Sequence, residues 1–219
     1  MRVRRNPLFF TVPIILLALA ALLLVWEIVT SNLPLSMRSS WPWKLKLLDV
    51  QSATAATTIA AGLAFARAQY ASAVRPILGW QGRVVKTTGL SSELVWRVSL
   101  VNGASAVAMI HSPYYRITLR AAANSSCRDS SWIPRGEAIS FLQAMGLILG
   151  EDFLLRHVGP AYPISTSPQS LAAFTPRAMA IIDEMLIRVE VTDQVGDSHR
   201  RIIHCMRGVI REPTEPTME

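Results

Sequence analysis

Hydrophobic residues dominate the first part of the chain. Between Pro7 and Trp26 every residue is uncharged, and most are Leu, Ile, Ala, Val or Phe. A helix over this run rises about 30 Å, which matches the hydrocarbon core of a bilayer. The pattern predicts a transmembrane helix from about Leu8 to Val29. Glu27 then lies near the membrane interface, where a charge costs less than at the bilayer centre.

A cleaved signal peptide is the alternative for this segment, because Met1–Arg5 is basic. The apolar run is longer than the roughly 7–15 residues of a typical signal-peptide core. Val25–Val29 also lacks the small residues that mark a cleavage site. Both observations favour an uncleaved membrane anchor.

A second, weaker apolar stretch runs from Val50 to Ala66 without a charge and is rich in Ala and Thr. It predicts a second helix over about residues 50–75, within a membrane region covering residues 1–76. Small residues four apart suit close contact between membrane helices. Three such pairs are Ser52/Ala56, Ala56/Ala60 and Thr58/Gly62. The alternative is a soluble or juxtamembrane amphipathic helix that ends before Pro76.

The linker between the two helices, residues 31–49, has the composition of a membrane interface. Indole rings prefer the headgroup zone and lysine side chains reach toward water. An ordinary loop is the alternative. The candidate membrane-interface residues are Trp41, Trp43, Lys44 and Lys46 in the linker, with Arg67 and Arg75 near the end of the second helix.

After Pro76 the pattern changes to a period of two, which is typical of strands with one buried face. Leu94–Val101 alternates and is followed by the turn pair Asn102-Gly103. Further strands are predicted over residues 106–110 and 114–119. The clearest hairpin joins residues 186–192 and 200–207 through the turn Asp193–Asp197.

One helix is predicted among the strands, from Arg135 to Met145. Its apolar residues recur at helical spacing, and Gly146 follows as a terminating residue. These apolar residues are Ala138, Phe141, Leu142 and Met145. The proline-rich stretch from Pro160 to Pro176 is predicted to be irregular.

Together these elements predict an α+β membrane protein. One or two N-terminal transmembrane helices precede an immunoglobulin-like β-sandwich with an inserted short helix. The sandwich covers residues 77–210, and residues 211–219 form a flexible tail. We find no internal repeat.

Charge adds a prediction about topology. The chain has 22 Lys and Arg against 15 Asp and Glu, a net charge of +7. The sequence shows no basic face with interleaved aromatic residues, so nucleic-acid binding is not expected. Under two spans, three basic residues lie in the connecting loop and seven lie on the other side, which puts the C-terminal domain in the cytoplasm. Those seven are Arg2, Arg4, Arg5, Arg67, Arg75, Arg83 and Lys86. A single span with the N-terminus inside would put the domain outside.

No catalytic or cofactor motif is present. The sequence lacks a phosphate-binding loop, a nucleotide fingerprint and a nucleophile elbow. His204 and Cys205 are adjacent strand residues that point to opposite faces, so no metal site is expected from them. Asp193 and Asp197 bracket a hairpin turn rather than a calcium loop. Cys127 and Cys205 are favoured as free thiols, although pairing between them stays open.

Several segments also resemble a loose group of uncharacterised bacterial membrane-anchored proteins. The segments are Arg67–Tyr70 leading to Arg75-Pro76, Leu100–Ala106, and Asp193–Asp197 with Arg200-Arg201. The resemblance covers about residues 50–207. It implies one or two N-terminal helices before a small β-sandwich, and it supplies no activity or catalytic residue.

These observations favour a non-enzymatic, membrane-anchored interaction module at the inner surface of the cell membrane. Its expected partners are the lipid bilayer and a membrane or peripheral protein. The alternative is an accessory or ligand-sensing subunit of a larger membrane complex. No cofactor is expected.

Overall fold

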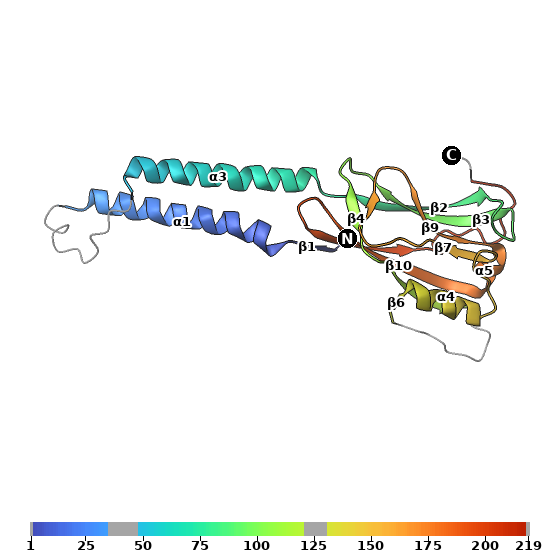
Figure 1. Ribbon diagram of the computed structural model, residues 1–219. Helices are drawn as coiled ribbons and strands as arrows, with labels where there is room; N and C mark the ends of the chain where they lie inside the picture. The colour runs from blue at the N-terminus through green and yellow to red at the C-terminus, as the bar shows by residue number, and fades with distance from the viewer. Residues whose placement is uncertain (1, 35–47, 121–130, 218–219) are drawn as a thin grey trace. The chain divides into compact units, whose positions relative to one another are not determined.

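A computed structural model of the chain describes residues 2–34, 48–120 and 131–217 (Figure 1). The chain divides into two compact units. One unit is residues 5–73, and the other combines the N-terminal residues before Arg5 with residues 74–219. The expected boundary at residues 76 and 77 lies close to this division.

The first unit is a pair of helices, α1 (Pro7–Asn32) and α3 (Val50–Ala73). They lie side by side and run in opposite directions (Figure 1). Pro7 stands at the first helical position, where its missing N–H costs nothing. Asp49 caps the start of α3, because its carboxylate accepts a hydrogen bond from the Ser52 N–H at 3.0 Å.

The second unit is β-rich and contains two antiparallel sheets. The smaller sheet has the strand order β2-β3-β9-β7. Its strands are β2 (Leu78–Lys86), β3 (Leu94–Asn102), β9 (Gln169–Phe174) and β7 (Phe153–Leu155). In β3 the predicted inner face is confirmed, since Trp96, Val98 and Leu100 are buried in the core.

The larger sheet has seven strands among the described residues, in the order β1-β11-β10-β4-β8, with β5 also pairing β10 and β6. The central strands are β11 (Ser198–His204), β10 (Ile182–Thr192), β4 (Ala108–Ile110) and β5 (Tyr114–Leu119). The outer strands are β1 (Arg2–Arg4), β8 (Tyr162–Ile164) and β6 (Ile133–Pro134). The predicted β10–β11 hairpin is confirmed, and Gly196 in its turn has a positive φ of 82°.

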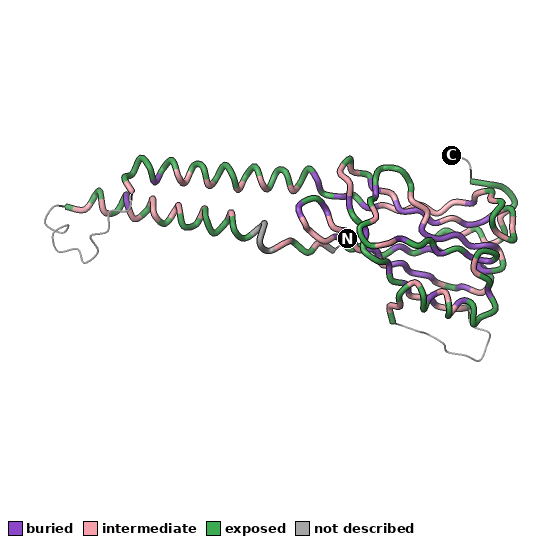
Figure 2. The backbone as a smooth tube through the Cα atoms, in the orientation of Figure 1, coloured by how far each residue is buried: buried purple, intermediate pink, exposed green. Residues whose placement is uncertain are grey.

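The two sheets share one hydrophobic core (Figure 2). The Trp96 indole of β3 crosses this core and donates a hydrogen bond to the Cys205 carbonyl at 2.8 Å. Gly82 on β2 makes room for the ring, because a Cβ there would lie 2.2 Å from Trp96 Cζ2. The absence of a side chain at Gly82 therefore determines where the indole sits.

Two short helices accompany the strands. The predicted helix is present as α4 (Arg135–Ala144), with Gly146 at a φ of +80° just after it. Ala138 and Leu142 are buried as expected. Met145, the last residue of the predicted helix, is its C-cap residue and is exposed.

The proline-rich stretch is more regular than predicted. It contains β8, β9 and a second helix, α5 (Pro176–Ile181). Thr175 caps α5, and its hydroxyl accepts a hydrogen bond from the Ala178 N–H at 3.5 Å. The prediction of irregular structure was wrong here because strand pairing with β3 and β4 overrides the local proline signal.

Residues after Ile210 also contact the sandwich. Arg211 donates hydrogen bonds to the carbonyls of Met179 and Ile182. The Thr217 N–H bonds the Val84 carbonyl at 3.0 Å, and the Thr217 hydroxyl accepts from the Val84 N–H at 2.9 Å. The segment expected to be a flexible tail therefore has hydrogen bonds to α5, β10 and β2.

Candidate membrane anchor

The outward surface of α1 is made of large apolar side chains. Leu16, Leu19 and Leu22 are 52–67% exposed. Of the helices in the described residues, Thr11–Asn32 is the one that is long and apolar enough to cross a membrane. By length and composition, both a membrane anchor and a signal sequence fit this helix.

The α3 side of the contact with α1 consists mostly of small side chains. On α3 the positions that are not exposed are Ala53, Ala56, Thr57, Ala60, Ala64, Arg67 and Ala71, which recur every three or four residues apart from the adjacent pair Ala56 and Thr57. On α1 the positions that are not exposed include Pro13, Leu17, Ala20, Leu24 and Glu27 at the same spacing, together with Ala21, Leu23, Trp26 and Thr30. This spacing keeps one stripe of each helix against the other, as in a coiled coil.

Polar groups reinforce this contact. The Thr57 hydroxyl reaches the Ala20 carbonyl of α1 at 3.1 Å and its own helix at the Ala53 carbonyl at 2.8 Å. Glu27 is buried, and its carboxylate accepts a hydrogen bond from the Leu48 N–H at 3.4 Å. The carboxylate lies beside the start of α3, where the helix dipole favours negative charge.

The predicted small-residue pairs are only partly at this contact. Ala56 and Ala60 are half-buried, whereas Ser52, Thr58 and Gly62 are exposed. A helical rotation of about 100° per residue explains the difference, because neighbouring small residues point in different directions. Since 16 of the 24 residues of α3 are Ala, Ser, Thr or Gly, the sequence alone did not identify the contacting stripe.

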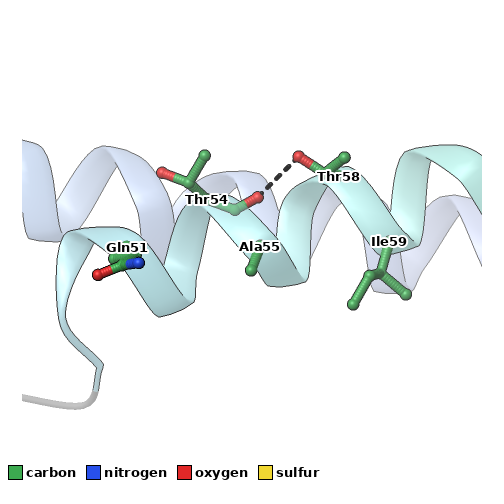
Figure 3. Close-up of a pocket in the computed structure, with 5 residues that line it drawn as sticks. All are labelled: Gln51, Thr54, Ala55, Thr58 and Ile59. Carbon is green, nitrogen blue, oxygen red and sulfur yellow. Dashed lines mark hydrogen bonds between the residues drawn. The ribbon is translucent and has the colours of Figure 1, made fainter.

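The opposite side of α3 carries a shallow hollow lined by Gln51, Thr54, Ala55, Thr58 and Ile59 (Figure 3). The Thr54 and Thr58 hydroxyls donate to the Val50 and Thr54 carbonyls, at 2.7 and 2.9 Å. These bonds within the helix reduce the cost of placing Thr in an apolar environment.

Two of the six candidate membrane-interface residues lie in the described part of the chain. Trp41, Trp43, Lys44 and Lys46 lie outside the described residues. Arg67 is half-buried on the α1-facing stripe of α3, and Arg75 is exposed in the connection between α3 and β2. Arg83 and Lys86 lie further along β2, and Lys86 pairs with Glu93 at 3.4 Å.

A strand that the sequence did not reveal precedes α1. β1 pairs antiparallel with β11, with Arg2 opposite Arg200, Val3 opposite His199 and Arg4 opposite Ser198. β1 therefore belongs to the sandwich, and so does β2, which follows α3. A segment of three alternating residues is too short to predict a strand from the sequence when its pairing strand is not known.

Val3 lies next to a buried polar pair. His199 Nε2 is 2.8 Å from Asp193 Oδ2, and both side chains are 1% exposed. The other carboxylate oxygen of Asp193 accepts from the Val195 and Asp197 N–H groups, at 3.0 and 2.8 Å. These hydrogen bonds stabilise the β10–β11 turn. Asp193 was predicted to lie in a hairpin turn, and it does.

The outer face of the larger sheet is rich in arginine and aromatic residues. The Arg188 guanidinium lies over the rings of Tyr114 and Trp132, at 4.7 and 4.9 Å. The Arg116 guanidinium also lies over the Trp132 ring, 5.4 Å from the ring centroid. Arg200 bonds Glu190 at 2.6 Å. The face combines residue types that are enriched at protein interfaces.

Reactive groups in the sandwich are suppressed by burial. Cys205 is a buried free thiol, and desolvation raises its pKa well above the ordinary range. Desolvation likewise raises the pKa of Tyr115. Cys127 lies outside the described residues. No group of His, Cys, Asp and Glu that could hold a metal ion is found in the part of the chain that the structure describes.

Comparison with protein-family models, with curated proteins and with solved structures gives no match to this chain.

Proposed function

We propose that the chain is a non-enzymatic interaction module anchored in the cell membrane by a helical hairpin. α1 and α3 are the two spans, and the sandwich stands at the cytoplasmic surface. The observation that carries this proposal is the pairing of β1 with β11.

The strands on either side of the helical hairpin belong to the same domain. β1 precedes α1 and β2 follows α3, and both strands belong to the sandwich. A chain that leaves a domain and returns to it crosses a membrane an even number of times. If α1 crosses, α3 crosses back. Removal of α1 as a signal peptide would also remove β1.

The helices have the dimensions that this proposal needs. At 26 and 24 residues they rise about 39 and 36 Å, more than the roughly 30 Å of the hydrocarbon core. α3 is less apolar than α1, but its hydroxyls are hydrogen-bonded and it packs on α1 through small residues. In this arrangement the strongly apolar helix inserts readily and the weaker one packs against it.

Charge supports the cytoplasmic side. Arg2, Arg4 and Arg5 precede α1, and Arg67 and Arg75 lie at the end of α3, all on the side of the sandwich under the hairpin topology. The connecting loop has Arg38, Lys44 and Lys46. Basic residues are retained on the cytoplasmic side.

The sandwich itself fits an immunoglobulin-like arrangement. The order β2-β3-β9-β7 corresponds along the chain to strands A-B-E-D, and β11-β10 with β4 and β5 corresponds to G-F-C. Such domains commonly serve as binding modules. The arginine and aromatic face of the larger sheet is the surface we expect a protein partner to contact.

Cysteine labelling tests the topology. In a Cys127→Ser background Cys205 stays unreactive because it is buried. Single cysteines replace Ser40 in the linker and the exposed Asp183 in the sandwich. We expect a membrane-impermeant maleimide to label position 40 in intact cells and position 183 only after permeabilisation. Labelling of both sites in intact cells would indicate one span, and labelling of position 183 alone would invert the orientation.

A disulfide tests the β1 pairing in membranes. Arg4 and Ser198 are directly opposite, within reach of a cysteine bridge. Oxidation of Arg4→Cys/Ser198→Cys should form the bridge. The matched control Arg4→Cys/His204→Cys should not, because His204 is at the other end of β11. Absence of the bridge in membranes would remove the parity argument.

A further inference from the structure

A small cavity lies on the outer face of the four-stranded sheet. It measures about 180 Å³ and is bounded by β3, β9, β7 and the connection between β2 and β3. Val95 and Ala173 form an apolar floor and are 0% and 4% exposed, although they point away from the main core. Leu154 adds an apolar wall. On an ordinary solvated strand surface such residues would be exposed, whereas here Val95 and Ala173 are buried beneath the other lining residues.

Arg97 is the one charged residue that lines this cavity. Its cross-strand neighbours are Arg83 on β2 and Ala173 on β9. Like charges directly opposite each other destabilise a sheet. In the described ranges we find no ion pair or hydrogen bond from the Arg97 side chain. Arg97 therefore brings one positive charge to the cavity, and no acidic residue is among its lining residues.

Two hydroxyl groups share the cavity with Arg97. Ser170 lies on the same strand as Ala173, β9, and Thr87 lies on the connection after β2. The Thr87 oxygen accepts a hydrogen bond from the Gly89 N–H at 3.4 Å, so the hydroxyl proton is available to a ligand. A guanidinium and hydroxyl donors around an apolar floor are suited to an oxyanion.

The volume limits the ligand. Drug-sized ligands and cofactors occupy pockets of about 300–1,000 Å³. A cavity of about 180 Å³ is smaller than that range, yet it exceeds the roughly 30 Å³ that one water molecule occupies in the liquid. We propose that the cavity binds a small oxyanion, the phosphate or carboxylate group of a ligand, through Arg97, Ser170 and Thr87. All its lining residues belong to the sandwich, so this proposal stands independently of the membrane topology.

Calorimetric titration of the full chain in an uncharged detergent tests the site. The probes are inorganic phosphate, glycerol 3-phosphate and acetate. We expect at least one probe to bind with a Kd below about 1 mM, and Arg97→Gln to weaken it at least tenfold. Arg97→Lys retains the positive charge but loses the paired N–H donors of the guanidinium, so its affinity should be intermediate. Ser170→Ala should weaken binding several-fold.

The matched control is Arg116→Gln, which removes the same charge from the larger sheet. Its affinity should stay within twofold of the original chain. An equal loss in Arg116→Gln and Arg97→Gln would show general charge attraction and overturn the proposal. Failure of all three probes to bind would also overturn it, provided that circular dichroism shows a folded chain.

A short-chain phosphatidic acid in the same detergent distinguishes the source of the oxyanion. Binding that is sensitive to Arg97→Gln and at least tenfold tighter for this lipid than for glycerol 3-phosphate would identify a lipid headgroup. Comparable binding of glycerol 3-phosphate would identify a soluble ligand. A ligand of either kind would favour a ligand-sensing subunit within the proposed interaction module.

Discussion

The two units of the chain use the same kinds of apolar residue in opposite ways. In the sandwich, Phe153, Phe174 and Leu100 are completely buried. In the helical hairpin large side chains such as Leu16, Leu19 and Leu22 are exposed, and the buried residues among the described positions are Ala53 and Glu27. One unit buries many of its large apolar groups in a core of its own, whereas the other exposes many of them. Figure 2 shows the corresponding burial, with buried positions concentrated in the strands and the two long helices mostly exposed or intermediate.

This difference identifies what stabilises each unit. Removing apolar area from water contributes about 25 cal/mol per Å², and this favours the sandwich in an aqueous environment. The hairpin instead depends on close contact of small residues and on hydrogen bonds such as Thr57 to Ala20. Those are the contacts that hold helices together in lipid, where no hydrophobic force acts between them.

The largest expected effect comes from breaking the polar pair inside the sandwich. Asp193→Ala removes the partner of His199 and of two N–H groups. We expect the free energy of unfolding of the sandwich to fall by about 3–5 kcal/mol, because these groups stay buried without partners. Urea unfolding followed by tryptophan fluorescence measures it, and the helical signal of the hairpin should persist.

Asp183→Ala is the matched control, since Asp183 is exposed. Its effect should stay within about 0.5 kcal/mol. A loss below 1 kcal/mol in Asp193→Ala would mean that the pair contributes little to the sandwich.

An intermediate effect is expected from filling the space beside Trp96. In Gly82→Ala the new methyl group meets the buried indole, which is held by its bond to the Cys205 carbonyl. Overpacking of this kind costs about 1–3 kcal/mol. Gly79→Ala on the same strand is the control, because its nearest neighbour would be 3.9 Å away. Equal melting temperatures for the two variants would contradict the packing described here.

The smallest effect belongs to the hairpin. Thr57→Val removes the hydroxyl that bonds α1. Bonds of this kind between membrane helices average about 0.6 kcal/mol and reach about 1.7 kcal/mol. Thr54→Val removes a hydroxyl that bonds only its own helix among the described contacts. Unfolding by sodium dodecyl sulfate should separate the two variants. A larger loss in Thr54→Val would place the helix contact on the other side of α3.

Elements with a clear local signal were predicted from the sequence. The alternation of β3, the β10–β11 hairpin and α4 with Gly146 all agree with the structure. β9 gave no such signal, because its residues from Leu171 to Phe174 are buried on both faces. On the outer face of β9, Ala173 is buried at the cavity. A polar residue, which would have completed the alternation of a strand with one exposed face, is therefore absent at this position.

The candidate sites depended more on long-range pairing. Arg97 and Arg83 are separated along the chain, and only the β2–β3 register places them opposite each other. Asp193 and His199 flank a predictable turn, yet their burial follows from the packing of the sheet around them. Trp41, Trp43, Lys44 and Lys46 stay predictions of a membrane interface.

The sequence by itself determined the apolar character of α1, the second helix and the main strands, because periodicity and turn residues are local properties. Only the tertiary structure decided that residues 2–4 belong to the sandwich. Three residues cannot form a stable strand alone, and their position depends on hydrogen bonds to β11, almost two hundred residues away. The even number of membrane crossings that we propose rests on that long-range pairing.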